Sequence, residues 1–88
     1  MPVVYIPSLM REATGGVEKV EVGGSTLRQA IDNLESLYPG ARERICEGDR
    51  IRPEIAVAVD GEITRLRMLQ PVGPLSEVHF VPAVSGGS

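Results

Sequence analysis

One amphipathic segment, residues 26–38, constrains the fold more than any other feature of the chain. Thr26 followed three residues later by Gln29 is typical of a capping box that opens a helix, and Pro39-Gly40 ends it. Apolar residues recur between these signals at helical spacing, which predicts a helix that buries one face. That face is expected to comprise Leu27, Ala30, Ile31, Leu34, Leu37 and Tyr38.

Short β-branched runs lie on both sides of this helix. Four of them are predicted as strands, at residues 3–6, 17–22, 55–59 and 77–81. Gly15-Gly16 closes the loop between the first two, and Asp60-Gly61 is a turn signal beyond which Ile63 is expected to pair briefly. The order hairpin, helix and two further strands predicts an α+β roll, a mixed sheet packed on one main helix.

Alternation along the last strand predicts which side chains enter the core. Val78 and Phe80 point one way, whereas His79 and Val81 point the other. We therefore expect His79 to be a solvated strand residue and Val81 to be exposed. The charged stretch 41–52 is expected to be irregular, with at most a helical turn around residues 42–46.

Length and composition limit the classes of function. Eighty-eight residues form one domain, with no room for a large bound cofactor. Three aromatic residues, dispersed basic residues and a net charge of −3 disfavour nucleic-acid binding. With no apolar stretch long enough to cross a bilayer and no leader segment, the chain is expected to be cytoplasmic and complete.

Neither metal chemistry nor nucleophilic catalysis is indicated by the inventory of reactive side chains. The chain has one cysteine, Cys46, and one histidine, and no cluster of ligands has metal spacing. Cys46 is expected to be a half-buried, inert thiol, and the alternative is a thiol whose pKa the nearby arginines lower. We therefore expect no catalytic residue and no bound metal, and the chain is not expected to be an enzyme.

The C-terminal residues are uncharged, and none after Val84 has a large side chain. Pro82 is expected to stop the last strand at Val81 and to project the chain end into solvent. We expect a domain over residues 1–84 and a flexible tail over 85–88, whose glycines let the backbone pass through a narrow enzyme channel. The alternative is an ordinary frayed terminus.

Three stretches together carry a family resemblance. They are the helix with its Tyr38-Pro39-Gly40 stop, Ala58-Val59-Asp60-Gly61-Glu62, and residues 78–87 ending Phe-Val-Pro-Ala-Val-Ser-Gly-Gly. The chain resembles the β-grasp, ubiquitin-like sulfur carriers of the ThiS and MoaD type. Ile6-Pro7-Ser8-Leu9 followed by Thr14-Gly15-Gly16 is similar to the branch that serves cysteine biosynthesis rather than to the small subunits of molybdopterin synthase.

The resemblance implies a carrier whose terminal glycine is chemically activated. Gly87 matches the glycine that an ATP-using activating enzyme adenylates and that is then converted to a thiocarboxylate, with Gly86 and Ser85 as the preceding tail residues. The thiocarboxylate would donate sulfur to a synthase in cysteine biosynthesis, or in the synthesis of a cofactor such as thiamine or molybdopterin. In the cysteine branch, the acceptor is an activated serine held by a pyridoxal-phosphate enzyme.

Ser88 departs from the pattern, because family members that are ready for activation end at the second glycine. Some relatives carry short extensions that a JAMM-type zinc protease removes, which implies a processing site between Gly87 and Ser88. The alternatives are that Ser88 is an artificial addition, or a neutral extension in a relative that has lost activation.

Partner docking is expected next to the tail. Val81 and Ile63 are predicted to form an exposed apolar patch there, with Val84 adjoining it and residues 42–52 as a second choice. Two other functions stay open: a ubiquitin-like modifier joined to lysines of other proteins, which begins with the same acyl-adenylate, and an interaction subunit whose tail is not activated.

Overall fold

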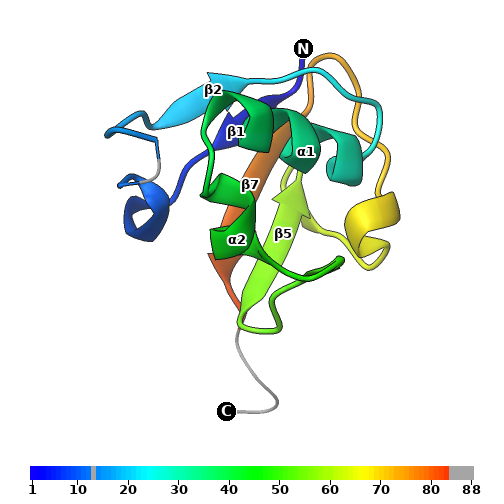
Figure 1. The fold of residues 1–88 in the computed structure, drawn as a ribbon. Coiled ribbons are helices and arrows are strands. Elements are labelled where there is room, and N and C mark those ends of the chain that lie inside the picture. Colours follow the sequence, from blue (N-terminus) through cyan, green and yellow to red (C-terminus); the bar gives the residue numbers. More distant parts are fainter. Residues whose placement is uncertain (13, 84–88) are drawn as a thin grey trace.

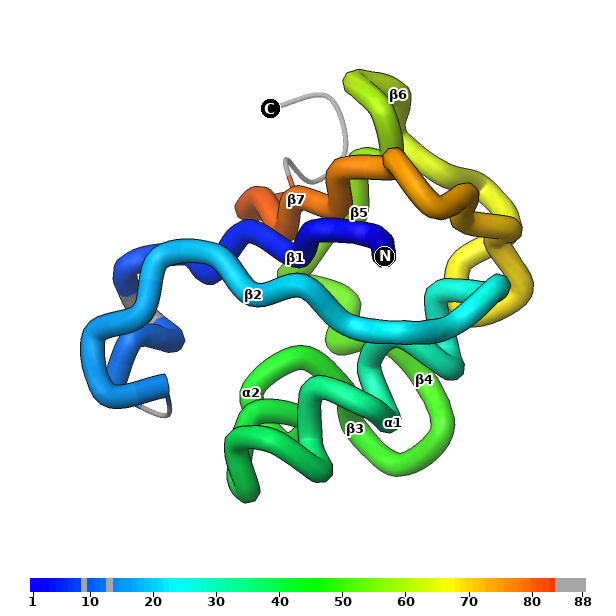
Figure 2. The backbone as a smooth tube through the Cα atoms, turned by 90° about the horizontal axis from the view of Figure 1, so that it is seen from above, coloured from blue at the N-terminus to red at the C-terminus, as the bar shows by residue number. Residues whose placement is uncertain are grey.

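The structure is a computed structural model, and it describes residues 1–12 and 14–83. A five-stranded sheet in the order β2-β1-β7-β5-β6 carries the longer helices on one face (Figures 1 and 2). Its strands are β1 (Val3–Tyr5), β2 (Lys19–Glu21), β5 (Ile55–Val59), β6 (Glu62–Ile63) and β7 (Glu77–Pro82). The other elements are η1 (Ser8–Met10), α1 (Leu27–Leu37), α2 (Ala41–Ile45), β3 (Cys46–Glu47), β4 (Arg50–Ile51) and η2 (Arg67–Leu69).

Helix α1 forms where the amphipathic pattern predicts it. The backbone N–H of Gln29 donates to Thr26 Oγ1 at 3.3 Å, as at a capped N-terminus. The second hydrogen bond of a capping box, from the Thr26 N–H to Gln29, does not form. Gln29 Oε1 accepts from the backbone N–H of Ser25 instead. Leu37 was also expected in the core, but it is exposed at the last position of the helix.

The core lies between α1 and the sheet. Leu27, Ile31 and Leu34 of the helix are fully buried, and Val78 and Phe80 of β7 face them as predicted. Burying each large aliphatic side chain contributes about 1.5–3 kcal/mol. The prediction of a mixed sheet on one main helix is therefore confirmed.

The first hairpin is shorter than its sequence pattern. β2 begins at Lys19, so the predicted strand 17–22 was too long at both ends, and Val17 is exposed. The tight turn before it uses Gly15 and Gly16, both at positive φ. Imperfect alternation of charged and apolar residues explains the error, because Val17 has no core position to fill.

Residues 41–52 are more regular than expected. They form the five-residue helix α2 and a hairpin in which Cys46 pairs with Ile51 and Glu47 with Arg50. Gly48 at φ +65° provides the turn. The apolar residues Ala41, Ile45 and Ile51 are buried, so this charged segment contributes a real part of the core.

Candidate functional site at the base of the tail

β7 is the middle strand of the sheet, and it leads directly to the C-terminal tail (Figure 1). It pairs in parallel with β1 and antiparallel with β5. The expectation that this strand stops at Val81 was wrong, because Pro82 pairs with Ile55 and the Ala83 N–H donates to Glu54 O at 2.8 Å. Residues 81–83, the tail base, are therefore held by β5.

The ring nitrogen of Pro82 leaves no hydrogen bond unmade in this ladder. Because the Ala83 N–H donates to Glu54 O, the neighbouring pair of Pro82 with Ile55 is a non-hydrogen-bonded pair of the antiparallel ladder, where no N–H of Pro82 is needed. On its other side β7 faces β1, but that pairing ends where Tyr5 meets His79. Proline is tolerated at such a position in a strand.

The predicted residues of the tail itself lie outside the described part of the chain. These are Val84, Ser85, Gly86, Gly87 and Ser88, together with the proposed boundary between residues 84 and 85. The described structure thus ends with Ala83, one residue before the last large side chain of the tail.

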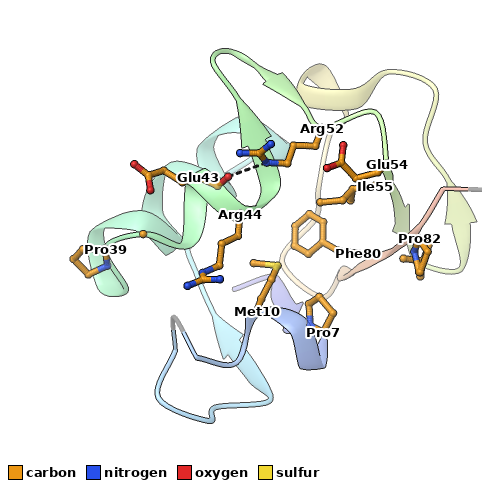
Figure 3. Close-up of a pocket in the computed structure, with 12 residues that line it drawn as sticks. Pro7, Met10, Pro39, Glu43, Arg44, Arg52, Glu54, Ile55, Phe80 and Pro82 are labelled. Carbon is orange, nitrogen blue, oxygen red and sulfur yellow. Dashed lines mark hydrogen bonds between the residues drawn. The ribbon is translucent and has the colours of Figure 1, made fainter.

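An open groove of about 650 Å³ adjoins the tail base (Figure 3). Met10 and Phe80 form its apolar floor, and Pro82 lines it beside the exit of the tail. Arg44 and Arg52 lie at its rim, where Arg52 Nε donates to the Glu43 carbonyl at 2.9 Å. Sequence reasoning missed this groove, because four separate segments of the chain build it.

Val81 and Ile63, the predicted docking residues, both lie on the outer face of the sheet. They are on β7 and β6, which are separated by β5. Val81 is half-buried rather than exposed, since it lies on the middle strand opposite Ala56. Ile63 is 59% exposed and pairs with Ala58, which is level with His79. A hollow of about 100 Å³ bordered by Ile63, Ala56 and Ala83 connects this edge to the tail base.

His79 is not the freely solvated residue that alternation predicted. Its ring stacks on Tyr5, with centroids 4.2 Å apart and an 11° angle between the planes. Nε2 also lies 3.6 Å from a carboxylate oxygen of Glu77. The parallel register of β1 and β7 brings these rings together, and this pairing has no signal in either local sequence.

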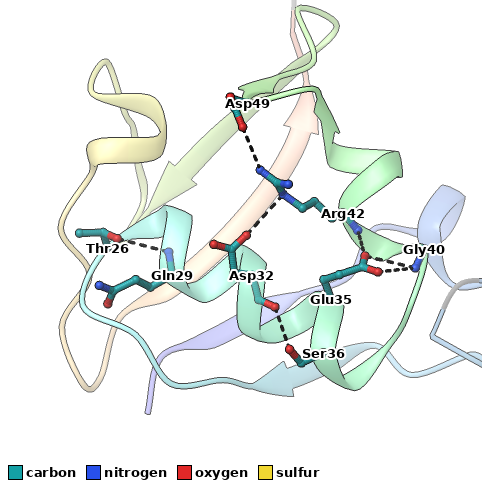
Figure 4. A network of polar contacts seen from close by, with 8 residues as sticks. All are labelled: Thr26, Gln29, Asp32, Glu35, Ser36, Gly40, Arg42 and Asp49. Carbon is teal, nitrogen blue, oxygen red and sulfur yellow. Dashed lines mark hydrogen bonds and ion pairs between the residues drawn. The ribbon is translucent and has the colours of Figure 1, made fainter.

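A polar network fixes α2 against α1 (Figure 4). The Glu35 carboxylate accepts from the backbone N–H of Arg42 at 2.8 Å and from that of Gly40 at 3.1 Å. These two bonds, Arg42 first, hold the pKa of Glu35 below its usual range. The Arg42 guanidinium in turn lies 3.4 Å from Asp32 and 3.8 Å from Asp49. This network positions the wall of the groove that carries Arg44.

Cys46 is a free thiol that is buried rather than half-buried as expected. Burial raises its pKa, although the positive charge of Arg42 opposes the shift. A protonated thiol is a poor nucleophile, which leaves Cys46 unsuited to relay sulfur.

Within residues 1–12 and 14–83, no group of three or more histidine, cysteine or acidic side chains is arranged to hold a metal ion. Among those same residues, no helix has the length and apolar character needed to cross a membrane.

Residues 4–87, nearly the whole chain, match the model of the ThiS family. The chain belongs to the ThiS family. It is 30% identical to the sulfur carrier protein CysO of Mycobacterium tuberculosis, over 96% of both chains. The match places this ThiS family member close to the CysO branch, as the Ile-Pro and Thr-Gly-Gly motifs predicted.

Solved structures agree with this assignment. A chain of the BexX/CysO complex of Amycolatopsis orientalis superimposes with a TM-score of 0.90 at 31% identity, over 99% of this chain and 100% of that one. The small archaeal modifier protein 1 of Methanosarcina acetivorans shares the fold, with a TM-score of 0.78 at 22% identity over 98% and 95% of the two chains. The predicted ubiquitin-like β-grasp fold is therefore confirmed, and this ThiS family member is a small sulfur carrier.

Proposed function

We propose that this carrier transports sulfur as a thiocarboxylate on Gly87, formed after Ser88 is removed. The observation that carries the proposal is the anchoring of the middle strand β7 as far as Ala83, which fixes the point from which the last residues extend. The family match ends at Gly87 and leaves Ser88 outside, which supports Gly87 as the functional terminus.

The chemistry needs a leaving group, because a carboxylate is a poor electrophile. In the proposed sequence, the Gly87 carboxylate attacks the α-phosphate of ATP and pyrophosphate leaves, giving an acyl-adenylate. Hydrosulfide then attacks the acyl carbon and displaces AMP, which gives the thiocarboxylate. The activating enzyme binds ATP and catalyses both steps, whereas the carrier binds that enzyme and positions the terminal carboxylate. Because activation consumes ATP, we propose that it takes place in the cytoplasm.

The sulfur is proposed to pass to a synthase, and the likeness to CysO favours an enzyme of cysteine biosynthesis that holds an activated serine on pyridoxal phosphate. The Amycolatopsis relative was solved in a complex with BexX, which supports docking of a folded partner on this kind of carrier. Catalysis is assigned to the partners, since the described residues offer only a buried thiol and a stacked histidine.

Ser88 is proposed to gate activation. One additional residue moves the terminal carboxylate by about 3.5 Å, and misplacement by about 1 Å already costs roughly a hundredfold in rate. The protein ending at Gly87 should support ATP–pyrophosphate exchange with the activating enzyme, whereas the protein ending at Ser88 should not. A JAMM-type metalloprotease should convert the longer protein into the shorter one. Equal exchange by both, with the longer mass intact throughout, would reject the gate.

Val81 and Ile63 are proposed to contribute to docking at the tail base, with Val84 adjoining them. Val81→Asp places a carboxylate in this apolar surface and should weaken binding to the activating enzyme by about 1 kcal/mol or more. Circular dichroism must show a folded variant, because Val81 is half-buried. Unchanged affinity in the folded variant would move the docking site elsewhere.

The shared fold of the archaeal modifier keeps protein modification as an alternative use of the same acyl-adenylate. Intact mass spectrometry after incubation with ATP, activating enzyme and a sulfur source distinguishes the two. Exchange of one oxygen for one sulfur on the free carrier supports sulfur transfer, whereas covalent adducts with other proteins support modification. An unchanged mass would favour an interaction subunit with an inactive tail.

A further inference from the structure

Large apolar side chains gather on the surface around η2. Ile63, Leu66 and Leu69 are 59%, 57% and 75% exposed, all within seven residues. The other exposed large apolar residues of the described chain are dispersed along the sequence at Met1, Val17, Leu37 and Leu75. A gathering of this kind next to a functional terminus marks an interaction surface more often than chance exposure does.

The segment that carries these side chains is firmly built. The Leu69 N–H donates to Leu66 O and the Gln70 N–H donates to Arg67 O, both at 3.0 Å. Gln70 O in turn accepts from the N–H of Leu27 at the start of α1, at 2.8 Å. Met68 packs against the core from the same turn. The leucines therefore point outward from an ordered turn whose inner side is already occupied.

Arg67 occupies the centre of this surface in a strained conformation. Its φ is +52°, a left-handed value that residues other than glycine and asparagine rarely adopt. Within the described part of the chain, its guanidinium makes no ion pair and no side-chain hydrogen bond, and the same holds for Arg65. Two cations thus flank the exposed leucines without a partner of their own.

Arg67 also connects the leucines to the tail base. It borders the hollow that reaches Ala83, and it borders a second groove, between η2 and the β3–β4 hairpin, that Leu66 and Leu69 line. The acidic residues of that second groove are Glu47 and Asp49, and Asp49 already pairs with Arg42. An enzyme that binds the tail is therefore positioned to contact the surface around Arg67 as well.

We propose that Leu66, Arg67 and Leu69, the η2 surface, dock the activating enzyme through an apolar pocket of that enzyme flanked by a carboxylate. The inference rests on the proposed function, and it adds a surface beyond Val81 and Ile63. We assign this surface to the activating enzyme because that enzyme must recognise the carrier before a thiocarboxylate is present on the tail. At that stage only the folded surface and an ordinary glycine terminus are available for recognition.

Leu69→Ser tests the apolar part, with Leu75→Ser as the matched control. Both leucines are strongly exposed, at 75% and 91%, so both variants should fold with little change in stability. With the protein ending at Gly87, ATP–pyrophosphate exchange by the purified activating enzyme should show about a tenfold higher KM for Leu69→Ser, as for an interface anchor. The KM of Leu75→Ser should be unchanged.

Arg67→Gly tests the charge without harming the fold, because glycine adopts the observed φ more readily than arginine. Its stability should be equal to or greater than that of the parent, while its KM should rise and depend less on salt concentration. Arg28→Ala, which removes an exposed cation from α1, should leave KM and its salt dependence unaltered.

The outcomes separate this inference from the proposed function. If the parent ending at Gly87 supports no exchange, the proposed function fails and the η2 surface loses its occupant. If the parent is active and both Leu69→Ser and Arg67→Gly keep its KM, the proposed function stands and the η2 surface is rejected.

Discussion

The side chain of Asp60 ties the turn after β5 to the start of β7. Its Oδ2 accepts from Ser76 Oγ and its Oδ1 accepts from the backbone N–H of Glu77, both at 2.9 Å. Asp60 itself has a φ of +53°, in the turn that Asp60-Gly61 was predicted to form. One residue therefore closes the hairpin and sets where the strand that leads to the tail begins.

Asp60→Ala should lower the free energy of unfolding by about 2 kcal/mol, because two hydrogen bonds to a charged acceptor are lost. Asp60→Asn keeps an acceptor oxygen and tolerates the left-handed conformation, so its cost should be at most about half as large. Urea denaturation of the two variants checks the order. If alanine is no worse than asparagine, the carboxylate does not hold β7.

At the scale of whole elements, the docking of α2 on α1 depends on the Glu35 carboxylate. Both of its bonds go to backbone N–H groups around the start of α2. A carboxylate suits this position, because the first N–H groups of a helix have no partner within it. The placement of α2 is thus set by one ionised side chain.

Because the folded state lowers the pKa of Glu35 from 4.5, its ionised form stabilises the fold. That contribution is complete above about pH 4.5 and disappears as the pH falls further, through the folded-state pKa. Glu35→Gln should therefore melt below the parent at pH 7, and the gap should narrow below pH 4.5. Thermal melts of both proteins from pH 7 to pH 3 measure the difference in melting temperature. A difference that stays constant would mean that ionisation of Glu35 does not stabilise the fold.

Elements with a clear local pattern were predictable from the sequence, whereas the β3–β4 hairpin was not. Helix α1 and strand β7 were predicted nearly to the residue from their periodic patterns, and β5 from its continuous apolar run. The strands of the β3–β4 hairpin have two residues each, too few to show alternation.

The candidate site was predictable only in part. Pro82 marked the end of β7 only approximately, since the strand continues through Pro82 itself. The groove floored by Met10 and Phe80 joins segments far apart in the chain. The Tyr5–His79 stack and the half-burial of Val81 depend on the register of the middle strand with its neighbours. Such contacts follow from tertiary pairing, which local pattern does not encode.

At the scale of the molecule, stability and activation should be separable. Residues 86–88 are Gly-Gly-Ser and carry no apolar side chain to bury. Their deletion should change the melting temperature little, while it should abolish ATP–pyrophosphate exchange. Differential scanning calorimetry and the exchange assay make the comparison. A large loss of melting temperature would show that the tail packs against the domain.

The parallel pairing of β1 with β7 has a mechanical consequence. The N-terminus and the C-terminal end of β7 lie at opposite ends of the domain (Figure 1), so a force that pulls the end of β7 away from the N-terminus slides β1 and β7 along each other. Their hydrogen bonds then bear the load together instead of opening one after another, as they would if peeled apart. The end of β7 is therefore held against a pull along the strand more firmly than an edge strand that could be peeled away.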